Sequence, residues 1–365
     1  MKKKVVNLVH KNGIKRAGAG SNTLVSVLVG ATSKKDYSNQ LKKLDCLGNL
    51  SKSDLPDIIS DLSLQNSSTS LYTYLIEHFP DLVISTLPIY QCKQRSGFVD
   101  SNELLDITVQ QLEAGVSFIT IHPTANQELV RLSLSRLVPC TSRGGAMVVK
   151  DLANRNFNAE NVYLRIIDEI IATAKKYRAA ISLGATFRSA NIFDSVDSCQ
   201  IGEFKVQKEI ADYIYNRGVD VIVEGPGHTP PNKIQQVARY YNKMSYPVMP
   251  LGPIPTDVAI GQDHISSSIG SVLLGMHQCA DIITSVTREE HTGGVPSIEA
   301  TIEAIKAARI AAHIIDINKL GDSSADKKIV AYRQEHHTCV YGKKNAGCSR
   351  CAEVCPLKVD VFLSD

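Results

Sequence analysis

The chain has 365 residues, of which 43% are apolar. It can therefore bury a large core, and its length suits one large α/β barrel with a small appendage. Its 40 basic and 37 acidic residues are mixed along the chain and leave a net charge of +3, which gives no electrostatic footprint for nucleic acid or membranes. A small-molecule partner is expected. No apolar run is long enough for a signal peptide or a membrane span, so a cytoplasmic protein is predicted.

Short β-branched apolar runs predict buried parallel strands at residues 25–29, 56–59, 82–87, 118–121, 180–183, 219–223, 247–251 and 281–286. Residues 140–142 are interpreted as a further short strand. Between these runs, apolar residues repeat at helical spacing, as at Ile166, Ile167, Ile170, Ile171 and Ala174, or Ile234, Val237, Ala238 and Tyr241. The alternation implies right-handed βαβ units and predicts a closed (β/α)8 barrel of the TIM type, with an open sheet as the alternative.

The C-terminal part of the sequence changes character. A long helix is predicted from the N-cap Ser297 to a stop at Gly321, and the polar residues 322–328 are interpreted as a linker. The predicted organisation is an N-terminal extension over 1–24, a catalytic barrel over 25–296, a C-terminal helix over 297–321, and a linker with a cysteine-bearing tail over 322–365.

Side chains able to bind or react follow the predicted strands at Asp61, Ser63, Tyr90, His122, Ser142-Arg143-Gly144-Gly145, Arg188, Glu224, His228 and His291. In a barrel, the C-terminal ends of the strands share one rim, where barrel enzymes build their active sites. Any one of these residues can simply satisfy loop backbone groups. Their recurrence after strand upon strand favours a site.

Two of these segments point to particular ligands. Glu224-Gly225-Pro226-Gly227-His228 leaves a strand through a turn that allows close backbone approach to a ligand, and its imidazole could join that of His291 on a zinc or ferrous ion. Ser142-Arg143-Gly144-Gly145 combines unshielded backbone N–H groups with a hydroxyl and a guanidinium, which suit a phosphate or carboxylate. A plain glycine turn is the simpler interpretation of the second segment.

Three of the nine cysteines, Cys348, Cys351 and Cys355, cluster near the C-terminus. Three thiolates leave one iron of a 4Fe–4S cluster open, whereas electron-transfer ferredoxins normally supply four. The open iron can chelate S-adenosylmethionine (SAM), whose reductive cleavage yields a 5′-deoxyadenosyl radical. The alternative is a structural zinc site that takes its fourth ligand from residues 336–339.

The chain resembles the phosphomethylpyrimidine synthase family, an atypical radical SAM group, from about Val27 to the C-terminus. The resemblance is carried in order by Pro88-Ile89-Tyr90-Gln91, Ser142-Arg143-Gly144-Gly145, Glu224-Gly225-Pro226-Gly227-His228, Leu251-Gly252-Pro253, Thr256-Asp257, Asp263-His264-Ile265, Glu290-His291 and the C-terminal cysteines. It implies a lyase that rearranges 5-aminoimidazole ribotide into 4-amino-5-hydroxymethyl-2-methylpyrimidine phosphate for thiamine biosynthesis. A sister branch, which makes the cobalamin precursor 5-hydroxybenzimidazole, and other radical lyases of imidazole nucleotides remain alternatives.

The resemblance also implies cofactors, partners and residue roles. The cofactors are a 4Fe–4S cluster, SAM and a zinc or ferrous ion, and the partners are an external electron donor and a second copy, in a homodimer whose tail caps the partner's site. Substrate-binding positions are Tyr90, His122, Ser142, Arg143, Gly144, Gly145, Arg188 and Glu224. Candidate catalytic residues are Glu224, His264 and Arg188. Metal-binding positions are His228 and His291 for zinc or iron, and Cys348, Cys351 and Cys355 for the iron–sulfur cluster.

The sequence departs from the family pattern at four pocket positions. Ala185 replaces an aspartate, Leu28 an asparagine, and Met249 and Gln262 each a tyrosine. The second and third tail cysteines are also separated by three residues where the family has four. The machinery is thus kept and the pocket altered. Two alternatives of other classes are a zinc-dependent barrel hydrolase, with the tail as a zinc knot, and a non-catalytic binding paralogue.

Overall fold

The computed structural model describes residues 3–51, 53–64, 70–93, 96–342, 351 and 354–359. The chain divides into two compact units, Met1–Ile315 and Asp316–Asp365. The barrel lies in the first unit. Among the described residues, no helix combines the length and the apolar character needed to cross a membrane.

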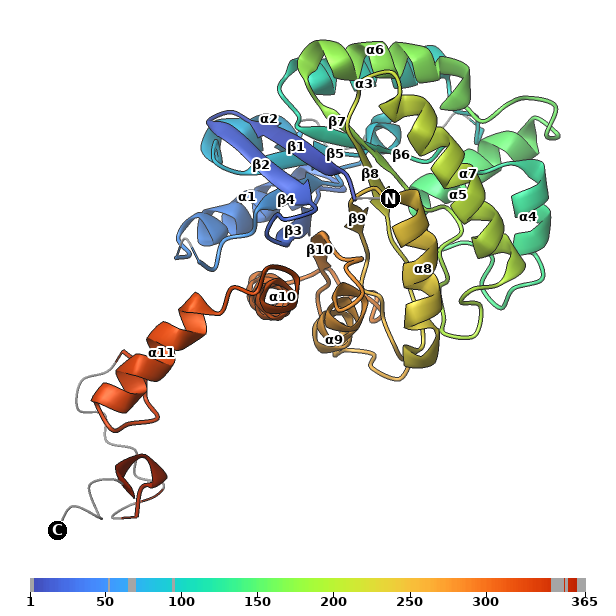
Figure 1. Ribbon diagram of the computed structural model, residues 1–365. Helices are drawn as coiled ribbons and strands as arrows, with labels where there is room; N and C mark the ends of the chain where they lie inside the picture. Colours follow the sequence, from blue (N-terminus) through green and yellow to red (C-terminus); the bar gives the residue numbers. More distant parts are fainter. Residues whose placement is uncertain are drawn as a thin grey trace. The chain divides into compact units, whose positions relative to one another are not determined.

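Eight parallel strands form the barrel, in the order β10-β3-β4-β5-β6-β7-β8-β9 (Figure 1). The ring closes between β9 and β10, where the Asp281 amide donates to the Val248 carbonyl at 2.9 Å. The predicted (β/α)8 fold is confirmed, and all eight predicted runs form strands. They are β3 (Leu24–Val29), β4 (Ile58–Asp61), β5 (Val83–Thr86), β6 (Phe118–Ile121), β7 (Ala180–Leu183), β8 (Val221–Glu224), β9 (Val248–Met249) and β10 (Ile282–Ser285).

In the first unit, helices lie outside the strands and bury apolar stripes against them (Figure 1). The predicted helical spacings are confirmed, because the apolar residues of α6 and α8 are buried. The helices are α1 (Lys34–Gly48), α2 (Leu71–His78), α3 (Ser101–Glu113), α4 (Gln127–Ser133), α5 (Arg143–Asn154), α6 (Ile167–Tyr177), α7 (Ser198–Tyr215), α8 (Ile234–Met244), α9 (Asp263–Gly275), α10 (Ile298–Leu320) and α11 (Ser324–Glu335). Short 3₁₀ turns are η1 (Pro88–Gln91), η2 (Leu164–Ile166), η3 (Pro231–Lys233) and η4 (Pro356–Lys358).

An N-terminal hairpin closes one end of the barrel. Strands β1 (Val5–His10) and β2 (Gly13–Gly18) pair antiparallel. Val6, Leu8 and Ala17 pack on the first inward side chains of the barrel strands, which are Leu24, Ile58, Val83, Phe118, Ala180, Ile222 and Ile282. The Lys4 amide donates to the Ser245 carbonyl at 2.9 Å, and the Asn7 amide to Asp220 Oδ2 at 2.8 Å. The hairpin therefore seals the N-terminal end of the barrel.

Three local structures differ from the sequence-based expectations. Residues 140–142 form no strand; they lead into α5, which Ser142 caps by accepting from the Gly145 amide. Residues 324–328 of the predicted linker are helical, because α11 begins at Ser324. The hairpin itself was not predicted. The long helix α10 is confirmed, with Ser297 accepting from the Ala300 amide and Gly321 following at φ +72°.

Candidate active site

A cavity of about 290 Å³ lies in the C-terminal mouth of the barrel. Because strand side chains alternate, residues two and four positions beyond the sealed layer also point inward. The second layer gives the cavity a floor of hydroxyls, from Ser26, Ser60, Thr120 and Thr284. The third layer gives walls, which include Leu28, Leu62, Leu87 and His122. The ends of β8 and β9 add Glu224, Met249 and Leu251, and loop residues complete the lining: Tyr90, Thr141, Ser142, Arg143, Arg188 and Glu290.

Two larger hollows, of about 640 and 570 Å³, lie beside the start of α3 around Asp100 and Glu103. Neither is lined by a residue of the predicted site. The mouth cavity is smaller, but six of the eight predicted substrate-binding residues line it. Its chemistry, rather than its size, therefore makes it the candidate active site.

One end of the mouth cavity is built to hold an anion. Ser142 Oγ accepts from the Gly145 amide at 3.2 Å and lies 2.7 Å from His122 Nε2. Burial lowers the pKa of His122 to about 4, so the ring is neutral near pH 7. The Arg143 guanidinium lies 5.4 Å from the Tyr90 ring centre. The N-terminus of α5, with its partial positive charge, and a guanidinium thus face the cavity together.

The glycines of this segment allow close packing that any side chain would block. A Cβ on Gly144 would lie 2.6 Å from His122 Cε1, and one on Gly145 would lie 2.6 Å from Thr186 Cγ2. Neither glycine lines the cavity. Their contribution is to let the start of α5 rest directly on the two strand-end loops that follow β6 and β7.

Arg188 and Glu224 form an ion pair on the cavity wall. Arg188 Nη1 donates to Glu224 Oε2 at 2.8 Å, and the Ala185 amide donates to the same oxygen at 2.9 Å. Both side chains are less than one-fifth exposed. The pair presents a cation and a carboxylate side by side, as a zwitterionic or hydrogen-bonding substrate requires.

His228 and His291 lie together on neighbouring loops. Their ring centroids are 5.1 Å apart, with the rings at 76°. His228 Nδ1 is 2.5 Å from Asp257 Oδ1, and His291 Nδ1 is 2.7 Å from Asp263 Oδ1. Carboxylates on both Nδ1 atoms orient the rings and direct Nε2 toward a ligand, as in carboxylate–histidine–metal arrangements.

The donor set at this pair fits zinc or ferrous iron, since two imidazole ligands leave positions open for a substrate or water. Burial lowers the pKa of His228, which keeps its ring neutral and able to bind a metal. Asp263 Oδ2 is buried without a hydrogen-bond partner among the described residues. In that part of the chain, no three His, Cys, Asp or Glu side chains are arranged around a metal position.

A second hollow, of about 440 Å³, opens beside the histidine pair. His228, His291, Asp257 and Asp263 form its polar side. Its apolar side is formed by Leu137, Val138, Ala190, Phe193, Ala259 and Ile260. Phe193 is 72% exposed and Leu137 is 71% exposed, so a wide apolar surface borders the candidate metal site.

Several predicted site residues lie elsewhere or beyond the described chain. His264 lines neither hollow at the mouth; it is buried on α9, with Nε2 3.7 Å from Glu303 Oε1. Cys348 lies outside the described residues. Cys351 is exposed and Cys355 is half-buried, both in the second unit. The assignment of these cysteines to a cluster stays a prediction.

Sequence reasoning missed some contributors and overvalued others. The partners of the histidines, Asp257 and Asp263, were seen only as parts of motifs. The hydroxyl floor was not identified, although strand alternation from the apolar first layer would have found it. Asp61 and Ser63 do not line the cavity. Asp61 instead accepts from the amides of Ser63 and Tyr72, both at 2.8 Å, and fastens the loop after β4.

The departures from the family pattern fall at different depths. Leu28 and Met249 line the cavity, together with Leu62, Leu87 and Leu251. Ala185 is buried at 2% exposure beside Glu224. Gln262 is exposed just before α9 and does not line the cavity. The cavity therefore has one anion-binding side and one aliphatic wall.

A TIM-type barrel whose C-terminal rim carries the start of α5, the Arg188–Glu224 ion pair and the His228–His291 pair has the architecture of a barrel enzyme. A family model described as the radical SAM ThiC family matches residues 4–360, and the chain belongs to that family.

The chain is 30% identical to the phosphomethylpyrimidine synthase of Pyrobaculum aerophilum, over 94% of this chain and 85% of that protein. It is 33% identical to the phosphomethylpyrimidine synthase of Saccharolobus islandicus, over 87% and 74%. Among solved structures, a Yersinia pestis DHPS aligns over 84% of this chain and 100% of that chain, with a TM-score of 0.47 and 10% identity. At those values the structural likeness adds nothing to the family assignment.

Proposed function

We propose that this chain is a radical SAM lyase that rearranges 5-aminoimidazole ribotide into 4-amino-5-hydroxymethyl-2-methylpyrimidine phosphate, in the pyrimidine branch of thiamine biosynthesis. The observation that carries the proposal is the mouth cavity, where the start of α5 meets the Arg188–Glu224 pair. Membership of the family and the names of its relatives support the same reaction.

The cavity residues suit the parts of a ribotide. The start of α5, with Ser142 and Arg143, would hold the phosphate through N–H groups and charge. The hydroxyl floor would contact the ribose, whose hydroxyls need donors and acceptors. Glu224 would accept from the exocyclic amine, and Arg188 would hold that carboxylate in place.

The cofactors follow from the donor sets. Cys348, Cys351 and Cys355 would hold a 4Fe–4S cluster, which with bound SAM supplies the 5′-deoxyadenosyl radical. His228 and His291 would hold a zinc or ferrous ion that orients a ligand at the rim. An external reductant, a cytoplasmic location and a homodimer in which each tail covers the partner's site complete the proposal.

A second candidate function, synthesis of 5-hydroxybenzimidazole or a related radical lyase reaction, is favoured by the aliphatic wall of the cavity. Leu28 and Met249 offer no hydrogen bonds to an aminoimidazole, and Ala185 supplies no carboxylate. Losing such a polar contact costs about 1–3 kcal/mol of discrimination between substrates. The wall could therefore redirect the product while the radical machinery stays the same.

The test is anaerobic reconstitution of the full chain with iron and sulfide, followed by SAM, dithionite and 5-aminoimidazole ribotide. Mass spectrometry reads 5′-deoxyadenosine and the organic product. Cys351→Ala should abolish both, and Cys46→Ala, at an exposed cysteine outside the tail, should not. A pyrimidine phosphate supports the first candidate and hydroxybenzimidazole the second. A colourless protein that forms no 5′-deoxyadenosine would leave the zinc hydrolase or the non-catalytic paralogue.

A further inference from the structure

A buried carboxylate behind the cavity joins the loops that carry the predicted substrate-binding residues. Glu203 lies in the second turn of α7 and is 2% exposed. Its Oε1 accepts from the Thr124 hydroxyl and from the Thr186 amide, both at 2.7 Å. Its Oε2 accepts from the Phe187 amide at 2.9 Å. Thr124 follows β6 and the other two donors follow β7, so one side chain holds two strand-end loops.

Thr186 is the point where three site segments meet. It is fully buried, and its hydroxyl lies 3.3 Å from that of Thr124, two residues after His122. The start of α5 rests on it, since a Cβ on Gly145 would lie 2.9 Å from its Cα. Two residues later comes Arg188. Fixing the Thr186 amide therefore fixes the relative positions of the start of α5, the His122 loop and the Arg188 loop.

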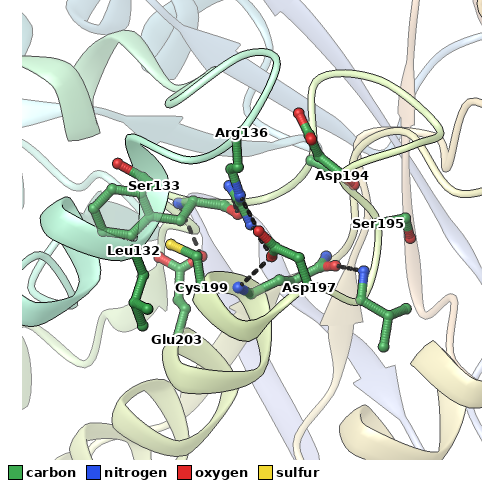
Figure 2. Close-up of polar contacts among 12 residues, drawn as sticks. Leu132, Ser133, Arg136, Asp194, Ser195, Asp197, Cys199 and Glu203 are labelled. Carbon is green, nitrogen blue, oxygen red and sulfur yellow. Dashed lines mark hydrogen bonds and ion pairs between the residues drawn. The ribbon is translucent and has the colours of Figure 1, made fainter.

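A second charged group holds the other side of the same loop. Arg136 Nη1 donates to the Phe187 carbonyl at 2.7 Å, while its Nε and Nη2 donate to the two Asp197 oxygens at 2.7 and 2.6 Å. Figure 2 shows Arg136 and Asp197 facing one another, with Glu203 farther along α7. Asp197 also caps α7 by accepting from the Gln200 amide. Both backbone polar groups of Phe187 are thus paired to ionisable side chains.

A packing role alone does not account for Glu203. Burying a carboxylate is costly, and burial raises the pKa of Glu203 to about 7. Apolar residues usually fill such positions at lower cost. Each of the three groups that donate to Glu203 belongs to a loop with a cavity-lining residue, His122 or Arg188.

We infer that Glu203 is a positioning residue, which with Arg136 clamps the loop after β7 so that Arg188 reaches Glu224 in the cavity. The activity readout of this inference rests on the proposed function, whereas the readout by amide hydrogen exchange does not. The clamp acts through backbone groups, so the Arg188 side chain is placed without itself touching Glu203.

The test compares Glu203→Gln with Asp57→Asn in the full chain. The glutamine keeps the volume but turns one acceptor into a donor that faces a backbone N–H. Asp57 is a matched control, because it is a buried acid at the opposite end of the barrel. It accepts from the Val25 amide at 2.9 Å and pairs with Lys15 and Arg309. Hydrogen exchange of the Thr186 and Phe187 amides is measured first, without any ligand.

The activity readout is the ratio of organic product to 5′-deoxyadenosine, with 5-aminoimidazole ribotide as substrate. A mere loss of folded enzyme lowers the yields of organic product and 5′-deoxyadenosine equally. A misplaced substrate instead lowers the amount of product formed per 5′-deoxyadenosine. Glu203→Gln should speed exchange of the two amides and lower the ratio about tenfold, the equilibrium cost of one hydrogen bond to a charged group. Asp57→Asn should leave both readouts unchanged.

Unchanged amide exchange in Glu203→Gln, or equal changes in both variants, would overturn the inference. If the wild-type chain forms no 5′-deoxyadenosine, the proposed function fails, but amide exchange still decides on the clamp. If Glu203→Gln does not fold, Thr124→Val removes one of the three bonds at nearly constant volume. That variant should then speed exchange of the Thr186 amide, and unchanged exchange would count against the clamp.

Discussion

The Ser142 hydroxyl serves two partners, and its removal should cost more than the loss of an ordinary helix cap. Ser142→Ala deletes the cap of α5 at the Gly145 amide, worth about 1 kcal/mol. It also leaves His122 Nε2, in a fully buried ring, without its partner at 2.7 Å, which costs about 1–3 kcal/mol. We expect a total loss of about 2–4 kcal/mol in the free energy of unfolding.

Equilibrium urea unfolding measures this loss, and Ser33→Ala is the matched control. Ser33 caps α1 by accepting from the Asp36 amide at 3.2 Å, the same distance as the Ser142 cap. Ser33 is exposed and should lose only about 1 kcal/mol. Equal losses in the two variants would refute the bridging role of Ser142 between the helix start and His122.

Three further predictions concern pH, specificity and metal. Because the unfolded His122 takes up a proton near pH 6.5 and the folded one only near pH 4, wild type should lose about 2 kcal/mol relative to His122→Gln between pH 7 and pH 5 in urea unfolding. A constant difference would contradict a buried neutral ring. Leu28→Asn should raise turnover of 5-aminoimidazole ribotide about tenfold, whereas Leu134→Asn, on an exposed leucine outside the cavity, should not. Asp257→Asn should lower zinc or iron affinity about 10–100-fold by metal titration, and His78→Ala should leave it unchanged.

The barrel could be predicted from the sequence because each strand is an apolar run buried on both faces. The same alternation places Ser26 and Ser60 on the cavity floor, since each lies two residues after an apolar side chain of the sealed layer. The strand-end positions of Tyr90, His122 and Arg188 also follow from the pattern. The sequence therefore also indicates how deep each of these residues lies in the mouth of the barrel.

Other features depend on contacts that no local pattern encodes. The clamp at Glu203 joins the loop before α7 to Thr124, which lies 79 residues earlier in the chain. A glutamate on a helix is ordinarily a solvated residue. Helix α11 buries no residue, so it lacks the apolar stripe that marks other helices. Residues 140–142 were assigned to a strand, although Ser142 directly before a glycine-containing helix start is a recognisable N-cap.

The hairpin of β1 and β2 closes one end of the barrel, so the cavity has a single open end among the described residues. In that part of the chain, the open end of the barrel is the rim, so a molecule on the hydroxyl floor enters and leaves there. A second molecule that binds at the rim must arrive after the molecule on the hydroxyl floor and leave before it. Turnover that uses both positions is thus ordered, last in and first out. A compound that binds at the rim would trap the deeper molecule instead of displacing it.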